Sequence, residues 1–208
     1  MVVQIPRWPC LIISGQRTGS TALATMVANN YNVKCFIEPN EQRIKIDEFE
    51  STYFNFEQKY VVKFMVDGIR NYRIYRNLLN ETQPFKIGLF RQDSIAQAAS
   101  MYVSTLSGVW FNNQLQEVNE NTPKVDPAGI LEINPKMINQ CIQFITKNNL
   151  LLRAYRLHYD VTLSYESLLF NESKWKESIK PINYNEIVEE ITNQFIKLGK
   201  PMVFDLDA

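Results

Sequence analysis

A short turn near the start of the chain combines residue types that bind phosphate and sulfate groups. Gly15 and Gly19 flank the turn and allow a ligand to approach the backbone closely. Arg17 supplies a fixed positive charge, and Ser20 and Thr21 supply hydroxyl groups. The turn is therefore a candidate anion site.

The segments on either side of the turn support this interpretation. The apolar run Cys10–Ser14 predicts a short buried strand, and an amphipathic pattern from Ala22 to about Asn30 predicts a helix. A helix that begins at such a turn presents unpaired backbone N–H groups at the positive end of its dipole. An ordinary strand-to-helix turn is the alternative. The turn is not a Walker loop, because its glycine spacing is one residue too short and no lysine follows Gly19.

The composition favours one globular domain over residues 1–208, with ample apolar material for a core. Lys plus Arg equals Asp plus Glu, at 22 each, so no overall basic field exists to hold nucleic acid. The 3 cysteines and the single histidine follow no metal-binding or disulfide spacing, so we expect reduced thiols and no metal site. No apolar run is long enough to span a bilayer, and we expect a soluble, cytoplasmic protein.

Alternating strand and helix patterns predict an α/β fold of the P-loop-like, three-layer kind, with a central parallel sheet flanked by helices. The expected strands are Cys10–Ser14, Val33–Ile37, Tyr60–Val66, Lys86–Arg91 and Val161–Tyr165. The expected helices are Ser20–Asn30, Gly68–Asn80, Asp93–Leu106, Lys136–His158 and Tyr184–Leu198. Residues 108–135 lack periodicity and read either as a lid on the acceptor side or as an unstructured surface insertion.

Ligands of an open parallel sheet bind beyond the carboxyl ends of its strands. The residues expected at that edge include Glu38 after the second strand and Lys63 to Asp67 at the end of the third. A second candidate anion site follows the fourth strand, where Arg91 and Ser100, on the next helix, could hold one doubly charged oxyanion. Two such sites suggest a ligand with phosphate groups at both ends.

These motifs resemble the sulfotransferases that use 3′-phosphoadenosine 5′-phosphosulfate, especially their bacterial trehalose-type branch. Arg17-Thr18-Gly19-Ser20-Thr21 resembles the 5′-phosphosulfate loop, and the segment from Arg91 to Ser100 resembles the 3′-phosphate site. Ser104–Trp110 and Tyr165-Glu166-Ser167-Leu168 resemble later segments of the family, the second its YEDL segment. The resemblance covers about Leu11 to Leu168. It implies that 3′-phosphoadenosine 5′-phosphosulfate is the donor substrate and that no metal ion is required. The residues it implies for donor binding are Gln16, Arg17, Thr18, Gly19, Ser20, Thr21, Arg91 and Ser100.

Two departures qualify this assignment. Many relatives place the arginine and serine eight positions apart, whereas Arg91 and Ser100 are nine apart, which leaves Gln97 as an alternative to Ser100. The RKGxxG segment of the cytosolic members has no counterpart here, which argues against the steroid and phenol branch.

Sulfuryl transfer requires a base for the acceptor proton and cations for the leaving phosphate. Cytosolic relatives carry a histidine base on the third strand, where this chain has methionine. In the heparan, tyrosylprotein and trehalose-type relatives a glutamate after the second strand is the base, which corresponds to Glu38, with Glu41 as the alternative. Lys63 and Arg17 are the expected catalytic cations, because a lysine on an apolar strand is costly unless its amine meets an anion.

We therefore expect an enzyme that moves a sulfuryl group from the donor to a hydroxyl of a small-molecule or carbohydrate acceptor, such as a glycolipid. A small-molecule kinase of related fold and a nucleotide-binding protein without turnover are the alternatives. The identity of the acceptor and the oligomeric state do not follow from the sequence.

Overall fold

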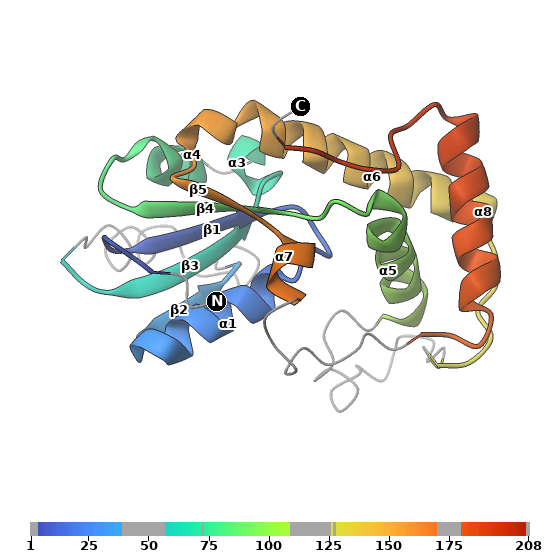
Figure 1. Ribbon diagram of the computed structural model, residues 1–208, viewed down its shortest axis with the longest axis horizontal. Coiled ribbons are helices and arrows are strands. Elements are labelled where there is room, and N and C mark those ends of the chain that lie inside the picture. Colours follow the sequence, from blue (N-terminus) through green and yellow to red (C-terminus); the bar gives the residue numbers. More distant parts are fainter. Residues whose placement is uncertain are drawn as a thin grey trace. The chain divides into compact units, whose positions relative to one another are not determined.

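The structure is a computed structural model that describes residues 4–38, 57–71, 73–108, 126, 128–169 and 180–206. Its centre is a sheet of five parallel strands in the order β2-β3-β1-β4-β5 (Figure 1). The strands are β1 Cys10–Ser14, β2 Lys34–Ile37, β3 Tyr60–Met65, β4 Phe85–Phe90 and β5 Val161–Ser164. The predicted α/β fold with a central parallel sheet is confirmed, and each strand lies within one residue of its predicted bounds.

Two compact units make up the chain. The first comprises Met1–Arg91, Asn148–Asn171 and Leu206–Ala208, and it contains the sheet. The second comprises Gln92–Lys147 and Glu172–Asp205. The assignment of residues 1–208 to one domain stays a prediction, and most of the expected lid, residues 109–125 and 127, lies outside the described residues.

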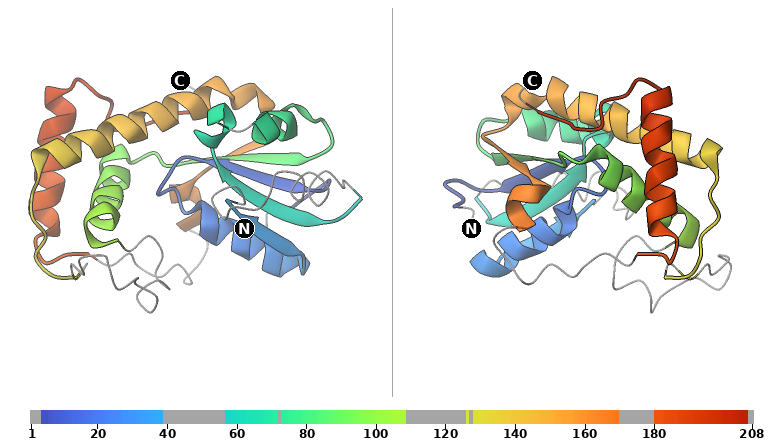
Figure 2. Two further views of the ribbon diagram at one scale, coloured as in Figure 1. Left: turned by 180° about the vertical axis from the view of Figure 1, so that it is seen from behind. Right: turned by 45° about the vertical axis from the view of Figure 1, so that its right-hand side comes forward.

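In the first unit, helices cover both faces of the sheet (Figures 1 and 2). Helix α1, Ser20–Tyr31, lies on one face, and α3, Gly68–Asn71, and α4, Arg73–Asn80, lie on the other. The described parts of the helix predicted over Gly68–Asn80 are helical, and residue 72 between α3 and α4 lies outside the described residues. Every residue of β1, β3 and β4 is buried, as expected for parallel strands that are covered on both sides.

Two hydrogen bonds between Asp160 and Lys86 explain how β5 is placed beside β4. Helix α6, Pro135–Ala154, ends before the predicted His158, because the chain tightens into the short helix η2, Arg156–His158. Asp160 then donates its N–H to the Lys86 carbonyl and accepts the Lys86 N–H on its carboxylate, at 2.9 and 2.8 Å. These paired hydrogen bonds fix where β5 begins.

Gly88 of β4 allows the ring of Tyr159 to lie directly against the strand. A Cβ atom at Gly88 would lie 2.3 Å from a ring carbon of Tyr159, a distance that real side chains do not tolerate. Burial raises the pKa of the Tyr159 hydroxyl, so the phenol remains neutral in this packed environment.

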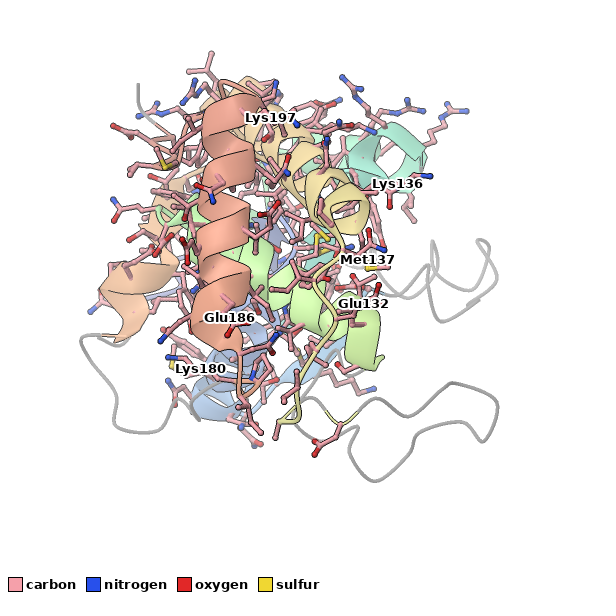
Figure 3. The ribbon with its side chains drawn as sticks, turned by 90° about the vertical axis from the view of Figure 1, so that its right-hand side faces the viewer. Glu132, Lys136, Met137, Lys180, Glu186 and Lys197 are labelled. Atoms are coloured by element: carbon pink, nitrogen blue, oxygen red, sulfur yellow. The ribbon has the colours of Figure 1, made fainter. Side chains whose placement is uncertain are left out.

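The second unit has a core of its own, built by α5, Ser94–Ser107, α8, Tyr184–Lys197, and the first part of α6. Asp93 caps α5 as predicted, because its carboxylate accepts the Ala96 N–H at 2.8 Å. Helix α8 carries Glu186 in its first turn and Lys197 in its last, which complements the helix dipole (Figure 3). The fully or nearly fully buried aliphatic and aromatic residues of this core include Tyr102, Ile138, Ile142, Ile145, Ile187, Ile191 and Phe195.

The cysteines agree with the expectation of free thiols. Cys10, Cys35 and Cys141 are all free, and burial raises the pKa of Cys10 to about 12 and that of Cys35 to about 11. Within the described parts of the chain, no helix combines the length and the apolar character needed to cross a bilayer.

Candidate functional site

The loop between β1 and α1 lies at the middle of the carboxyl edge of the sheet, because β1 is flanked by β3 and β4. Buried Thr18 stabilises the loop by donating its hydroxyl to the Gly15 carbonyl at 3.0 Å. Gly19, with φ of 74°, is the N-cap residue of α1 and, as a glycine, makes no side-chain cap hydrogen bond. The turn thus places backbone N–H groups at the positive end of the α1 dipole, where they favour an anion.

Arg17 and Arg91 come together at this loop, although 74 positions separate them. Arg91, directly after β4, donates from Nη1 to the Arg17 carbonyl at 3.4 Å. Burial and, to a smaller extent, the nearby charge of Arg91 together lower the pKa of Arg17 to about 10. Two partly buried arginines at the loop that precedes the N-terminus of α1 form a site that favours a multiply charged anion.

Arg17 adopts a backbone conformation that residues other than glycine rarely take. Its φ is 59°, in the left-handed region, and Glu38 shares this property with a φ of 47°. Both residues lie just beyond the carboxyl end of a strand, at the same edge of the sheet. Such conformations cost about 1 kcal/mol or more each and concentrate at functional sites, which supports a role for both residues beyond folding.

Glu38 and Lys63 form an ion pair at the edge strand. Ile37 is paired with Lys63 in the sheet, and the Glu38 N–H donates to the Lys63 carbonyl at 2.8 Å. The Lys63 Nζ contacts Glu38 Oε1, and the Lys63 side chain is only 3% exposed. The expectation that these two residues lie together at the strand ends agrees with this contact.

The face of the sheet on which Lys63 lies follows from its neighbour. Phe64 stacks on Tyr75 of α4, with ring centroids 4.3 Å apart, so Lys63 points to the opposite face, where α1 lies. Burial lowers the pKa of Lys63 to about 7, whereas the Asp67 carboxylate favours the ammonium form. Glu38, in direct contact, acts in the same direction as Asp67 and compensates part of the desolvation cost.

Helix α7, Tyr165–Leu169, contributes two further contacts that the sequence analysis did not assign. The Arg91 guanidinium carbon lies 4.7 Å from the ring centroid of Tyr165. The Arg91 Nε lies 4.0 Å from Glu166 Oε1. Both residues directly follow β5 and so belong to the same carboxyl edge as the loop, which is the signal that could have identified them.

The other predicted site residues lie on the loop, on α1 and on α5. In the loop and α1, Gln16 and Thr21 are half-buried and Ser20 is buried. Ser100 and Gln97 lie on α5 in the second unit, so their role at a phosphate held by Arg91 stays a prediction. Glu41 lies outside the described residues, and among those described no group of three or more His, Cys, Asp or Glu residues is arranged to hold a metal ion.

No family model matches the chain. No curated protein matches it either. Among solved structures, the chain is similar to an uncharacterized protein from Eubacterium ventriosum, with 12% sequence identity and a TM-score of 0.40. The match covers 88% of this chain and 99% of that one.

Proposed function

We propose that this protein is a sulfotransferase that takes a sulfuryl group from 3′-phosphoadenosine 5′-phosphosulfate and passes it to an acceptor hydroxyl. The observation that carries the proposal is that Arg17 and Arg91 come together at the loop before α1, which resembles a 5′-phosphosulfate loop. This arrangement supports the binding of a highly charged anion. The acceptor is proposed to be a carbohydrate or another small molecule that carries a hydroxyl group.

Lys63 and Glu38 supply the groups that the transfer requires. The acceptor oxygen attacks the sulfur atom, and the bond between sulfur and the bridging oxygen of the 5′-phosphate breaks. The acceptor proton passes to the Glu38 carboxylate, and 3′,5′-adenosine bisphosphate leaves. The Lys63 ammonium stabilises the charge that develops on the bridging oxygen. Because Lys63 and Glu38 are in contact, a sulfuryl group held by the ammonium also lies within reach of the base.

Calorimetric titration with 3′,5′-adenosine bisphosphate, AMP and ATP with magnesium tests donor recognition. We expect the bisphosphate to bind at least about tenfold more tightly than AMP, since the second phosphate adds charge-assisted hydrogen bonds. Arg17→Ala and Arg91→Ala should each weaken this binding by about tenfold or more. Arg76→Ala is the matched control, because Arg76 is exposed on α4 in the same unit.

Turnover is tested separately with a radiolabelled sulfuryl donor and a panel of sugars and alcohols. Glu38→Gln should abolish transfer and leave bisphosphate binding within about twofold, since it removes the base and keeps the side-chain shape. A preference for ATP with magnesium would instead support a kinase. Binding of the bisphosphate without transfer to any acceptor would support a nucleotide-binding protein.

A further inference from the structure

We propose that Tyr165 and Glu166 are positioning residues that hold the Arg91 guanidinium against the β1–α1 loop. Both residues begin α7 after β5 has ended, so neither takes part in the strand pairing of the sheet. Their contacts converge on one cation, which the sequence motifs alone do not link to them. The consequence for donor binding rests on the proposed function, whereas the positioning itself does not.

Three contacts restrain Arg91 from different directions. The Tyr165 ring covers one face of the guanidinium at 4.7 Å, and Glu166 Oε1 lies 4.0 Å from Nε. On the third side, Nη1 donates to the Arg17 carbonyl at 3.4 Å. Together these contacts direct the guanidinium toward the loop, so that it reaches an anion bound at the start of α1.

The Glu166 contact is long for a hydrogen bond, and this has a consequence for ligand binding. Arg91 Nε is buried and makes no hydrogen bond to the described residues. A carboxylate at 4.0 Å therefore orients the cation electrostatically without occupying its N–H group. The N–H group thus keeps its capacity to donate a hydrogen bond, which is what a positioning residue must allow.

Repulsion from Arg17 makes this restraint necessary. The charge of Arg91 lowers the pKa of Arg17, so the two cations disfavour each other when no anion lies between them. Without Tyr165 and Glu166, the flexible Arg91 side chain would move away from Arg17 into solvent. An incoming anion would then have to order the side chain, at a cost in affinity.

The test observes Arg91 directly by NMR, through its side-chain Nε–H signal, which the substitution Arg91→Lys identifies. Stacking on Tyr165 should shift this proton signal by the ring current and slow its exchange with water. Tyr165→Leu should abolish the shift, Tyr165→Phe should retain it, and Glu166→Gln should speed the exchange. Glu81→Gln is the matched control, because Glu81 is exposed in the same unit. An Nε–H signal that Tyr165→Leu and Glu166→Gln leave unchanged would overturn the inference.

A titration with inorganic pyrophosphate then connects positioning to anion binding without assuming the donor. Tyr165→Leu should weaken pyrophosphate binding about fivefold in the wild-type background. In the Arg91→Ala background the same substitution should have an effect below about twofold, since the residue acts through Arg91. Equal losses in both backgrounds would mean a merely structural role. If these effects appear and 3′,5′-adenosine bisphosphate binds no better than pyrophosphate, the proposed function fails and the positioning stands.

Discussion

Lys63 and Glu38 form an ion pair that joins the ends of two neighbouring parallel strands, β3 and β2. The ammonium is almost fully buried, at 3% exposure, whereas the carboxylate is 18% exposed. The two partners therefore differ in what their removal should cost. Loss of the carboxylate leaves a buried charge without its partner, and loss of the lysine leaves a carboxylate that water can still reach.

Glu38→Gln should lower the free energy of unfolding by about 3 kcal/mol near pH 6, because the Lys63 ammonium then remains buried without its contact partner. Lys63→Met should be neutral or stabilising, since methionine fits the apolar interior of β3. Urea unfolding followed by circular dichroism measures both changes, with Glu189→Gln on the exposed side of α8 as the control. Equal destabilisation by the two substitutions would contradict the assignment of the buried charge.

The stability of the protein should depend on pH through Lys63. Its pKa is lowered from 10.5 to about 7 in the folded state, and the unfolded chain restores the ordinary value. Between these pH values the unfolded chain binds more protons, so the free energy of unfolding rises with pH. Lys63→Met should remove this part of the rise. Unfolding curves across that window test it, and parallel profiles for the two proteins would show that Lys63 does not titrate there.

Arg17→Gly should separate backbone strain from ligand binding. Glycine tolerates a φ of 59° at little cost, and the change also removes repulsion from Arg91. We expect a gain of about 1 kcal/mol in the free energy of unfolding and a loss of bisphosphate affinity of about tenfold. Asn32→Gly is the control, because Asn32 has a φ of 51° at the end of α1, away from the loop. A destabilised Arg17→Gly protein would indicate that the arginine is structural.

Gly88→Ala should destabilise the first unit, because the new methyl group would overlap the ring of Tyr159. We expect a cost of about 3 kcal/mol, as for other overpacked sites in a core. The cost should fall below about 1 kcal/mol in a Tyr159→Ala background, where the ring is absent. Urea unfolding of the four proteins of this cycle gives the coupling, and a cost that persists without the ring would assign it to the backbone of β4.

Several features of the fold could be read from the sequence because they depend on local patterns. The apolar runs predicted the five strands of the described sheet, and the capping side chain of Asp93 predicted the start of α5. Where a pattern continued past a structural break, the prediction failed, as for the helix that ends at Ala154. Periodicity does not report that break, where the chain tightens into η2 before Asp160 bonds to Lys86 of a distant strand.

The chemical groups at the strand ends could be predicted from the sequence, since a strand boundary and a residue type are both local properties. The sequence placed Glu38, Lys63 and Arg91 at the carboxyl edge of the sheet. Which of these groups contact each other depends on how the whole chain folds. Arg91 reaches the Arg17 carbonyl, and Tyr165 covers its guanidinium, because the strand order places β1 beside β4 and β4 beside β5. Strand order and side-chain rotamers follow from the packing of the whole sheet, which no local segment encodes.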